Sequence, residues 1–247
     1  MKTRIMFLIG TMLVLIFGVI ISIQYKSKSP LLIPCDDNLL DLHISGFEPT
    51  YEGDNIGDED EMETFSSSIP SYNELYSNAE LILVVLPTGI RELKSAEILS
   101  EVKVQKVLKG DTILKQDDNI YIYEPFYINY IYMKPRLAEI PNQNRIDYTG
   151  VSNIMQKDKE YVVFLKSFEY PSDYVRNREE ELSYIYADRY FGQFPVSLNE
   201  YIIVDGTEQQ ILTYLDVMKY DCITSNVEFY DAYLKLQEEI MVHFEIH

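Results

Sequence analysis

Histidine is the side chain most often used for acid–base chemistry and metal binding near neutral pH, and this chain has only three. His43 lies in the first fifth of the chain, whereas His243 and His247 lie four residues apart at its C-terminus. The His-Glu-x-x-His metal motif is absent, and so are the Gly-x-Ser-x-Gly motif and the glycine-rich phosphate-binding motifs. The sequence therefore indicates no catalytic residue, no metal site and no cofactor site.

Carboxylates are far more numerous, with 40 Asp and Glu residues in the chain. A pair of them could supply the acid and the base that glycosidases use. Because so many acids form pairs by chance, their number alone does not indicate a site. An enzyme of the cell envelope with a carboxylate-based site stays open as an alternative, and carboxylates buried in a concave pocket would favour it.

Tyrosines are a third candidate for functional residues, because the chain has 21 of them and several lie close together between positions 121 and 132. Rings on a barrel strand can stack against sugars or nucleotides, but tyrosines are also common as half-buried residues of a sheet. Both interpretations stay open. The candidate stacking surface consists of Tyr121, Tyr123, Tyr127 and Tyr130.

The chain has two cysteines, Cys35 and Cys222, far apart in the sequence. In an oxidising compartment they could form a disulfide, and two free thiols fit the count equally well. The sequence does not show whether the two backbones approach closely enough to pair. A disulfide between Cys35 and Cys222 is therefore one of two alternatives.

Charge is distributed unevenly along the chain, which has 21 basic and 40 acidic residues. The first 30 residues contain four of the basic residues and no acid, so the remainder carries 17 basic against 40 acidic residues. Nucleic acids and anionic lipid surfaces are bound chiefly through Lys and Arg, and both would repel such a domain. We expect no nucleic-acid partner.

An uncharged run of 21 residues extends over residues 5–25, and a membrane-spanning helix needs about 20 mostly apolar residues. A cleaved signal peptide would have a shorter apolar run and a small-x-small cleavage site, and the nearest such pattern, Ser27–Ser29, is followed by Pro30. Cleavage stays the alternative. We expect a single-pass signal anchor in the cell membrane, with residues 1–4 in the cytoplasm and the C-terminal domain outside.

Residues 26–70 lack a periodic apolar pattern and contain a dense run of Asp and Glu, which favours an acidic flexible linker. Ser71 followed by Glu74 is a capping-box pattern and predicts that a short helix begins there. We expect the folded β-barrel domain over residues 71–205 and a helical segment over residues 206–247.

Six short apolar or alternating runs between about residue 80 and residue 205 are typical of β-strands. Turn residues separate them, without long helices between them, which favours a mostly antiparallel sheet or a small barrel. We expect a closed or nearly closed barrel of five or six strands. The runs are Leu81–Leu86, Ser95–Leu108, Asn119–Glu124, Tyr161–Leu165, Leu182–Tyr186 and Tyr201–Val204.

Two further capping-box patterns, which begin at Thr207 and Ser225, predict two C-terminal helices. After the second pattern, apolar residues recur at helical spacing and should pack on the barrel. An alternative is that this stripe faces a protein partner or another copy of the chain. The stripe consists of Phe229, Tyr233, Leu236, Ile240 and Phe244.

The run Val102–Asp111, which ends in Val-Leu-Lys-Gly-Asp, resembles a recurring pattern in small extracytoplasmic domains of low-GC Gram-positive bacteria. Those domains are related in fold to the tissue-inhibitor (TIMP) and netrin-like barrels of the oligosaccharide-binding (OB) type. The resemblance extends over Ser71–Val204. The other matching segments are Tyr72–Val85, Asn119–Tyr123, Tyr161–Leu165 and Phe191–Val196.

The resemblance implies a small antiparallel OB-like barrel. Together with the uncharged run over residues 5–25 and the two C-terminal capping boxes, it leads us to expect a mainly β fold: a small antiparallel OB-like barrel with an N-terminal transmembrane helix and two C-terminal helices. Domains of this kind are binding modules, and the family has no catalytic residues to carry over. The chain lacks the N-terminal Cys-x-Cys with which tissue inhibitors engage a protease metal, so that activity is not implied. We expect a membrane-anchored, extracytoplasmic binding or interaction module and not an enzyme, with a protein partner as one candidate.

Overall fold

The computed structural model describes residues 39–40, 42–45, 69–94, 97–110, 114–129, 145–148, 151–171, 173–198, 200–204 and 212–246. The predicted membrane helix over residues 5–25 and Cys35 lie outside the described residues, so both stay predictions. Within the described part of the chain, no helix is long and apolar enough to span a membrane.

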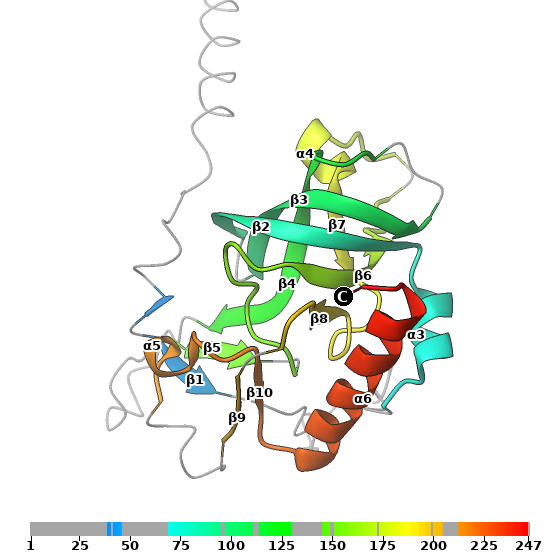
Figure 1. The fold of residues 1–247 in the computed structure, drawn as a ribbon. Helices are drawn as coiled ribbons and strands as arrows, with labels where there is room; N and C mark the ends of the chain where they lie inside the picture. Colours follow the sequence, from blue (N-terminus) through cyan, green and yellow to red (C-terminus); the bar gives the residue numbers. More distant parts are fainter. Residues whose placement is uncertain are drawn as a thin grey trace, which may run out of the picture. The chain divides into compact units, whose positions relative to one another are not determined.

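A closed barrel of five strands is the centre of the described structure (Figure 1). β4 pairs with β3, β3 with β2, β2 with β6 and β6 with β7, and β7 returns to β4. The prediction of a mainly β chain with a small barrel is confirmed. The strands are β2 (Leu81–Lys94), β3 (Glu97–Lys109), β4 (Asn119–Asn129), β6 (Tyr161–Ser167) and β7 (Ser183–Tyr186).

The expectation of an antiparallel barrel needs one correction. Most neighbouring strands of the barrel are antiparallel, but β4 and β7 run parallel to each other. A closed ring with an odd number of strands cannot reverse direction at every step, so a barrel of five needs a parallel pair. The strand order places the third barrel strand beside the fifth, which is compatible with an OB-like barrel.

Two barrel strands extend beyond the predicted runs Leu81–Leu86 and Asn119–Glu124, and each continues through a proline. β2 runs through Pro87 and Gly89, and its register with β3 shifts between Pro87 and Arg91. Gly89 has a φ of +86°, which glycine adopts without steric cost. β4 likewise continues through Pro125. Irregular register allows proline within a strand, because the ladder of hydrogen bonds is already interrupted there.

The first half of β2 is buried on both faces, as its unbroken apolar run predicts. Leu81, Leu83 and Val85 belong to the cluster that fills the barrel. Ile82 and Val84 belong to a second cluster, together with residues of α3 (Tyr72–Asn78) and α6 (Val227–His243). The barrel therefore has an interior core and a core on one outer face.

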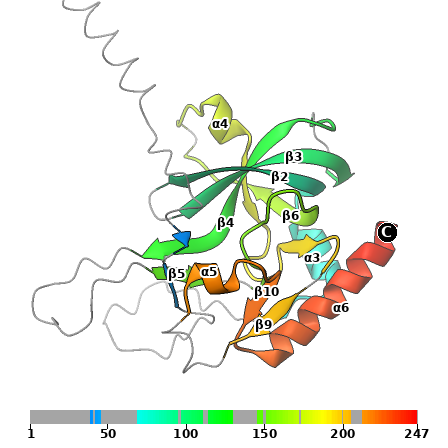
Figure 2. The same cartoon turned by 60° about the vertical axis from the view of Figure 1, so that its left-hand side comes forward.

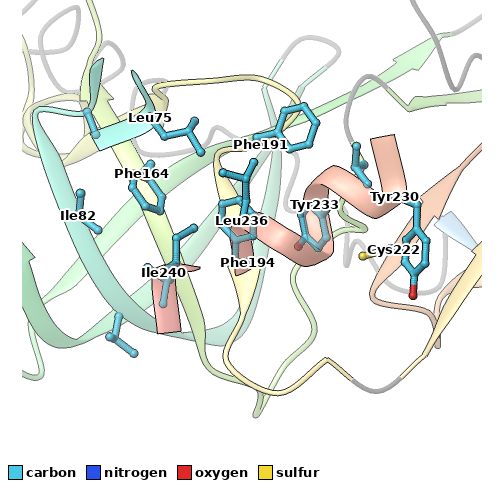
Figure 3. Close-up of a cluster of buried hydrophobic side chains, with 14 residues drawn as sticks. Leu75, Ile82, Phe164, Phe191, Phe194, Cys222, Tyr230, Tyr233, Leu236 and Ile240 are labelled. Atoms are coloured by element: carbon cyan, nitrogen blue, oxygen red, sulfur yellow. The ribbon is translucent and has the colours of Figure 1, made fainter. Parts of the chain in front are cut away.

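α6 packs on this outer face, as the apolar stripe predicts (Figure 3). Tyr233, Leu236 and Ile240 are 0%, 4% and 0% exposed. Phe229 is only partly buried. The barrel side of the same core includes Phe194 of β8 (Gln193–Pro195), a short strand that pairs with β6.

The helix starts follow the local sequence, with one correction. Ser71 caps α3, and its backbone N–H donates to Glu74 Oε2 at 2.7 Å, which confirms the predicted capping box. α6 is capped by Asn226 and not by Ser225, because the Asn226 side-chain oxygen accepts the Glu228 N–H at 2.8 Å. Asn is as good an N-cap as Ser, and it lies directly before the helix.

A further core is formed by residues outside the barrel together with residues near the ends of β3 and β4. Figure 2 shows the short strands and the short helix that contribute to it. Strand β1 (His43–Ser45) pairs in parallel with β5 (Arg145–Tyr148), which itself pairs with the far end of β4. β9 (Tyr201–Ile203) and β10 (Cys222–Thr224) form a separate parallel pair. The short helix α5 (Tyr214–Val217) contributes Tyr214 and Val217 to this core.

The Tyr201–Val204 strand is therefore not a barrel strand, because the pairing of β4 with β7 closes the ring without it. Part of the predicted linker is also folded, since Leu39, Leu42 and Ile44 are buried in this further core. In the helical C-terminal segment, α5 is a helix of four residues, and residues 207–210 lie outside the described part.

Candidate functional site

Tyr121 and Tyr123 lie on the outer face of β4. Their neighbours Ile120 and Ile122 are fully buried in the barrel, whereas both tyrosines are half-buried. β3 and β7 flank β4 on its two sides, so the tyrosines stand on a continuous sheet. The side chain of Tyr127 and all of Tyr130 lie outside the described residues, so their part in a stacking surface stays a prediction.

Three more rings extend from Tyr123 in a row. The ring centroids of Tyr123 and Phe168 are 5.3 Å apart, and those of Phe168 and Tyr170 are 5.6 Å apart. Tyr170 and Tyr174 stack with 5.3 Å between centroids and 8° between ring planes. Tyr174 is 48% exposed, and the other three rings are half-buried. We refer to Tyr123, Phe168, Tyr170 and Tyr174 as the aromatic ladder.

The connection between β6 and β7 supplies three of the four ladder residues. It spans residues 168–182 and contains the short helix α4 (Arg178–Glu181), which Figure 1 shows above β3 and β7. These three residues were not predicted, because the expected stacking surface lay within a single strand and its continuation. The closely spaced rings Phe168, Tyr170 and Tyr174, in a segment with no strand pattern, were the available signal.

Charged contacts fix this connection on the barrel. Lys94 Nζ of β2 lies 2.8 Å from a carboxylate oxygen of Glu92 and 2.8 Å from one of Glu179 in α4. Tyr174 donates its O–H to Glu180 Oε1 at 2.7 Å. Because α4 is tied both to β2 and to the outermost ring, the ladder has a defined position on the sheet.

The electrostatic setting of the β4 tyrosines is acidic. Burial first, and then nearby carboxylates led by Glu101, raise the pKa of Tyr121. Burial first, and then the neighbouring Tyr170, raise the pKa of Tyr123, while Lys94 lowers it and Glu179 makes a smaller raising contribution. Both phenols therefore stay protonated at neutral pH and can donate a hydrogen bond.

The carboxylate-based alternative depends on buried acids, and Glu124 of β4 is fully buried. Its Oε1 accepts the Ser100 hydroxyl, and its Oε2 accepts the Met155 N–H at 2.9 Å. Arg91 Nε lies 3.8 Å from the same carboxylate. Burial raises the pKa of Glu124, and Arg91 is the main opposing influence. This arrangement binds the carboxylate within the protein and leaves it no access to a substrate.

A polar hollow of about 610 Å³ lies beside the loop that precedes β6. Its lining includes Leu86, Asp158, Lys159 and Glu160. Both acids are exposed, and Lys159 forms an ion pair with the buried Asp221. Exposed acids at the rim of an open hollow are not the buried carboxylate cluster that would favour an enzyme.

Cys222 in β10 is completely buried and forms no disulfide with another described residue. Burial raises the pKa of its thiol, and Asp221 raises it further. Because Cys35 lies outside the described residues, pairing with Cys222 stays a prediction. A Cys35 thiol would have to enter the core to form that bond.

The structure shows no metal site at the described C-terminal histidine, His243. His243 packs against the rings of Tyr72, Tyr76 and Phe244, with 4.8 Å between its centroid and that of Tyr72. His247 lies outside the described residues. In the part of the chain that the structure covers, no group of three or more His, Cys, Asp and Glu residues could hold a metal ion.

The Val-Leu-Lys-Gly motif joins α3 to the barrel. Lys109 Nζ donates to the backbone oxygens of Tyr76 and Ala79 at the C-terminal end of α3, at 2.6 Å in the case of Ala79. Gly110 has a φ of +118°, and a Cβ there would lie 2.8 Å from the Glu80 oxygen. The motif therefore has a structural role, and the candidate for ligand contact is the aromatic ladder.

Comparison of the chain with protein-family models, with curated proteins and with solved structures found no match. The geometry of the chain itself therefore carries the functional inference.

Proposed function

We propose that this chain is a membrane-anchored, extracytoplasmic binding module whose ligand contacts the aromatic ladder. The observation that carries the proposal is a row of four half-buried or exposed rings on an outer face of a closed barrel. Aromatic rings offer flat faces that stack on other rings and attract cations. Their side chains have few rotatable bonds, so they lose little conformational entropy on binding. Such a surface binds without any catalytic group.

The position of the ladder supports the proposed relationship to OB-like, netrin-like barrels. OB-type barrels bind ligands on the face of their second and third strands, next to the loop between the fourth and fifth. Here the second and third barrel strands are β3 and β4, and the connection between the fourth and fifth carries Phe168, Tyr170 and Tyr174. This fold analogy and the ring geometry favour the same face.

The location at the cell membrane rests on the uncharged run over residues 5–25. The full-length protein, expressed in a Gram-positive host, should stay in the membrane fraction after an alkaline wash. Recovery from the medium of a chain that begins near Pro30 would instead identify a cleaved signal peptide.

A panel of probes tests the binding function. Full-length protein in phosphatidylcholine nanodiscs is titrated with a peptide of six arginines, with chitohexaose and with a peptide of six glutamates. We expect at least one probe to bind, and Tyr174→Ala to weaken that binding. Tyr201→Ala is the matched control, because Tyr201 is 50% exposed and also stacks on a tyrosine, Tyr230. Absence of binding, or equal effects of the two substitutions, would contradict the proposal.

A further inference from the structure

The aromatic ladder already holds one cation that belongs to the chain itself. The guanidinium carbon of Arg176 lies 5.6 Å from the centroid of the Tyr170 ring. This distance is within the range of about 6 Å over which a ring face attracts a cation. Arg176 is exposed, so solvent and other molecules reach this side of the ladder. The contact identifies a ring face that accepts a guanidinium.

The charges around the ladder favour a cation as well. The connection over residues 168–182 contains five acidic residues and two basic ones. The second of the two, Arg178, pairs with Glu181 at 3.3 Å. The nearby Lys94 pairs with Glu92 and Glu179. An anionic ligand would meet a surplus of carboxylates at this surface, whereas a cationic ligand would be attracted by it.

We propose that the aromatic ladder binds a guanidinium or ammonium group of a basic peptide segment, and that Arg176 competes with this group for the face of Tyr170. The inference rests on the proposed binding function and adds the chemical class of the ligand. The expected ligand is a protein segment rich in Arg or Lys, because several cations in a row complement both the row of rings and the surrounding carboxylates. A neutral sugar could stack on the rings, but its binding would not be strengthened by the surplus of negative charge.

Competition between Arg176 and the ligand predicts that two substitutions change the peptide affinity in opposite directions. Removal of the Arg176 guanidinium should strengthen binding of a cationic peptide, whereas removal of a ring should weaken it. An exposed cation–π contact corresponds to about a two- to fivefold change in affinity. Added salt should weaken the binding, because exposed charges are screened over about 10 Å at 0.1 M ionic strength.

The experiment titrates full-length protein in phosphatidylcholine nanodiscs with a fluorescent peptide of six arginines. We expect Arg176→Gln to strengthen binding about two- to fivefold and Tyr170→Leu to weaken it by a similar factor. Arg178→Gln is the control for charge, because it removes the same charge from the same connection without a contact to Tyr170. Tyr201→Leu is the control for the loss of a half-exposed ring elsewhere. Both controls should change the affinity less than twofold.

The outcomes separate this inference from the proposed function. Equal effects of Arg176→Gln and Arg178→Gln would overturn the competition at Tyr170 and with it the inference. If Tyr170→Leu weakens binding of chitohexaose but not of the arginine peptide, the ladder is a binding surface for a neutral ligand, so the inference fails and the proposed function survives. If Tyr170→Leu and Tyr201→Leu have the same effect on the binding of both probes, the inference and the proposed function both fail.

Discussion

The barrel carries aromatic side chains on two of its outer faces, and the two sets differ in burial. Between the barrel and the helices α3 and α6, Phe164 of β6, Phe194 of β8 and Tyr233 of α6 are fully buried. Tyr233 donates its O–H to the Gln193 backbone oxygen at 2.8 Å. On the face of β3 and β4, the rings of the aromatic ladder stay half-buried or exposed. The same residue types thus fill a core on one face and remain accessible on the other. If this comparison is right, substitutions on the first face change stability and substitutions on the second change binding.

The largest effect is expected from a charge placed under α6. Leu236→Asp should lower the free energy of unfolding by about 4 to 5 kcal/mol, because the carboxylate would be buried without a partner. Val242→Asp is the control on the same helix, since Val242 is 73% exposed, and it should cost less than about 1 kcal/mol. Urea unfolding followed by far-UV circular dichroism measures both. A small effect of Leu236→Asp would mean that α6 does not cover this face in solution.

Removal of one ring from each face gives the next largest effect. Phe194 stacks on Tyr233 with 4.8 Å between centroids, so Phe194→Ala should lower the free energy of unfolding by about 3 to 4 kcal/mol. Tyr174→Ala should change the urea midpoint much less, because about half of Tyr174 is exposed and its hydrogen bond to Glu180 lies at the surface. A loss of stability in Tyr174→Ala as large as that in Phe194→Ala would assign the ladder to packing and remove the contrast between the faces.

The smallest expected effect is on the pH dependence of stability. It compares the buried Glu124 with Glu74, which lies in the exposed capping box of α3. Burial raises the pKa of Glu124 above its ordinary 4.5, so this group stabilises the fold less as the pH rises from 4.5 through its folded-state pKa. Hydrogen bonds from Ser71 lower the pKa of Glu74, so its contribution is lost as the pH falls below 4.5. Glu124→Gln should therefore flatten the dependence of stability on pH above 4.5 and leave the dependence below it unchanged. Parallel stability curves of wild type and Glu124→Gln above pH 4.5 would contradict this assignment.

Features determined by neighbouring residues were predictable from the sequence. The capping box at Ser71 and Glu74 and the stripe of α6 depend on spacings of three and four residues, and the structure has both. Five of the six predicted runs are barrel strands. A strand between two cores has an unbroken run of apolar residues, and a strand with one covered face has an alternating run. The closed barrel followed from those runs.

Features determined by distant residues were not predictable in this way. The Tyr201–Ile203 run reads like a barrel strand, and only its pairing with β10 shows that it lies elsewhere. The ladder combines Tyr123 with rings that follow β6, more than 40 residues later in the sequence. Leu39 and Ile44 lie in a segment without periodicity, and they join a core through contacts with residues far along the chain. In each case the decisive contact is long-range, and the local sequence does not show which distant residue makes it.

Tyrosine-selective labelling of the full-length protein, quantified for each residue by mass spectrometry, tests most directly whether the aromatic ladder is a ligand surface. In the free protein, Tyr174 and Tyr201 should be labelled and Tyr233 should not, in line with exposures of 48%, 50% and 0%. A saturating concentration of the arginine peptide, or of chitohexaose, should then protect Tyr174 and leave the labelling of Tyr201 unchanged. Protection of Tyr174 no greater than that of Tyr201 with either probe would contradict the account.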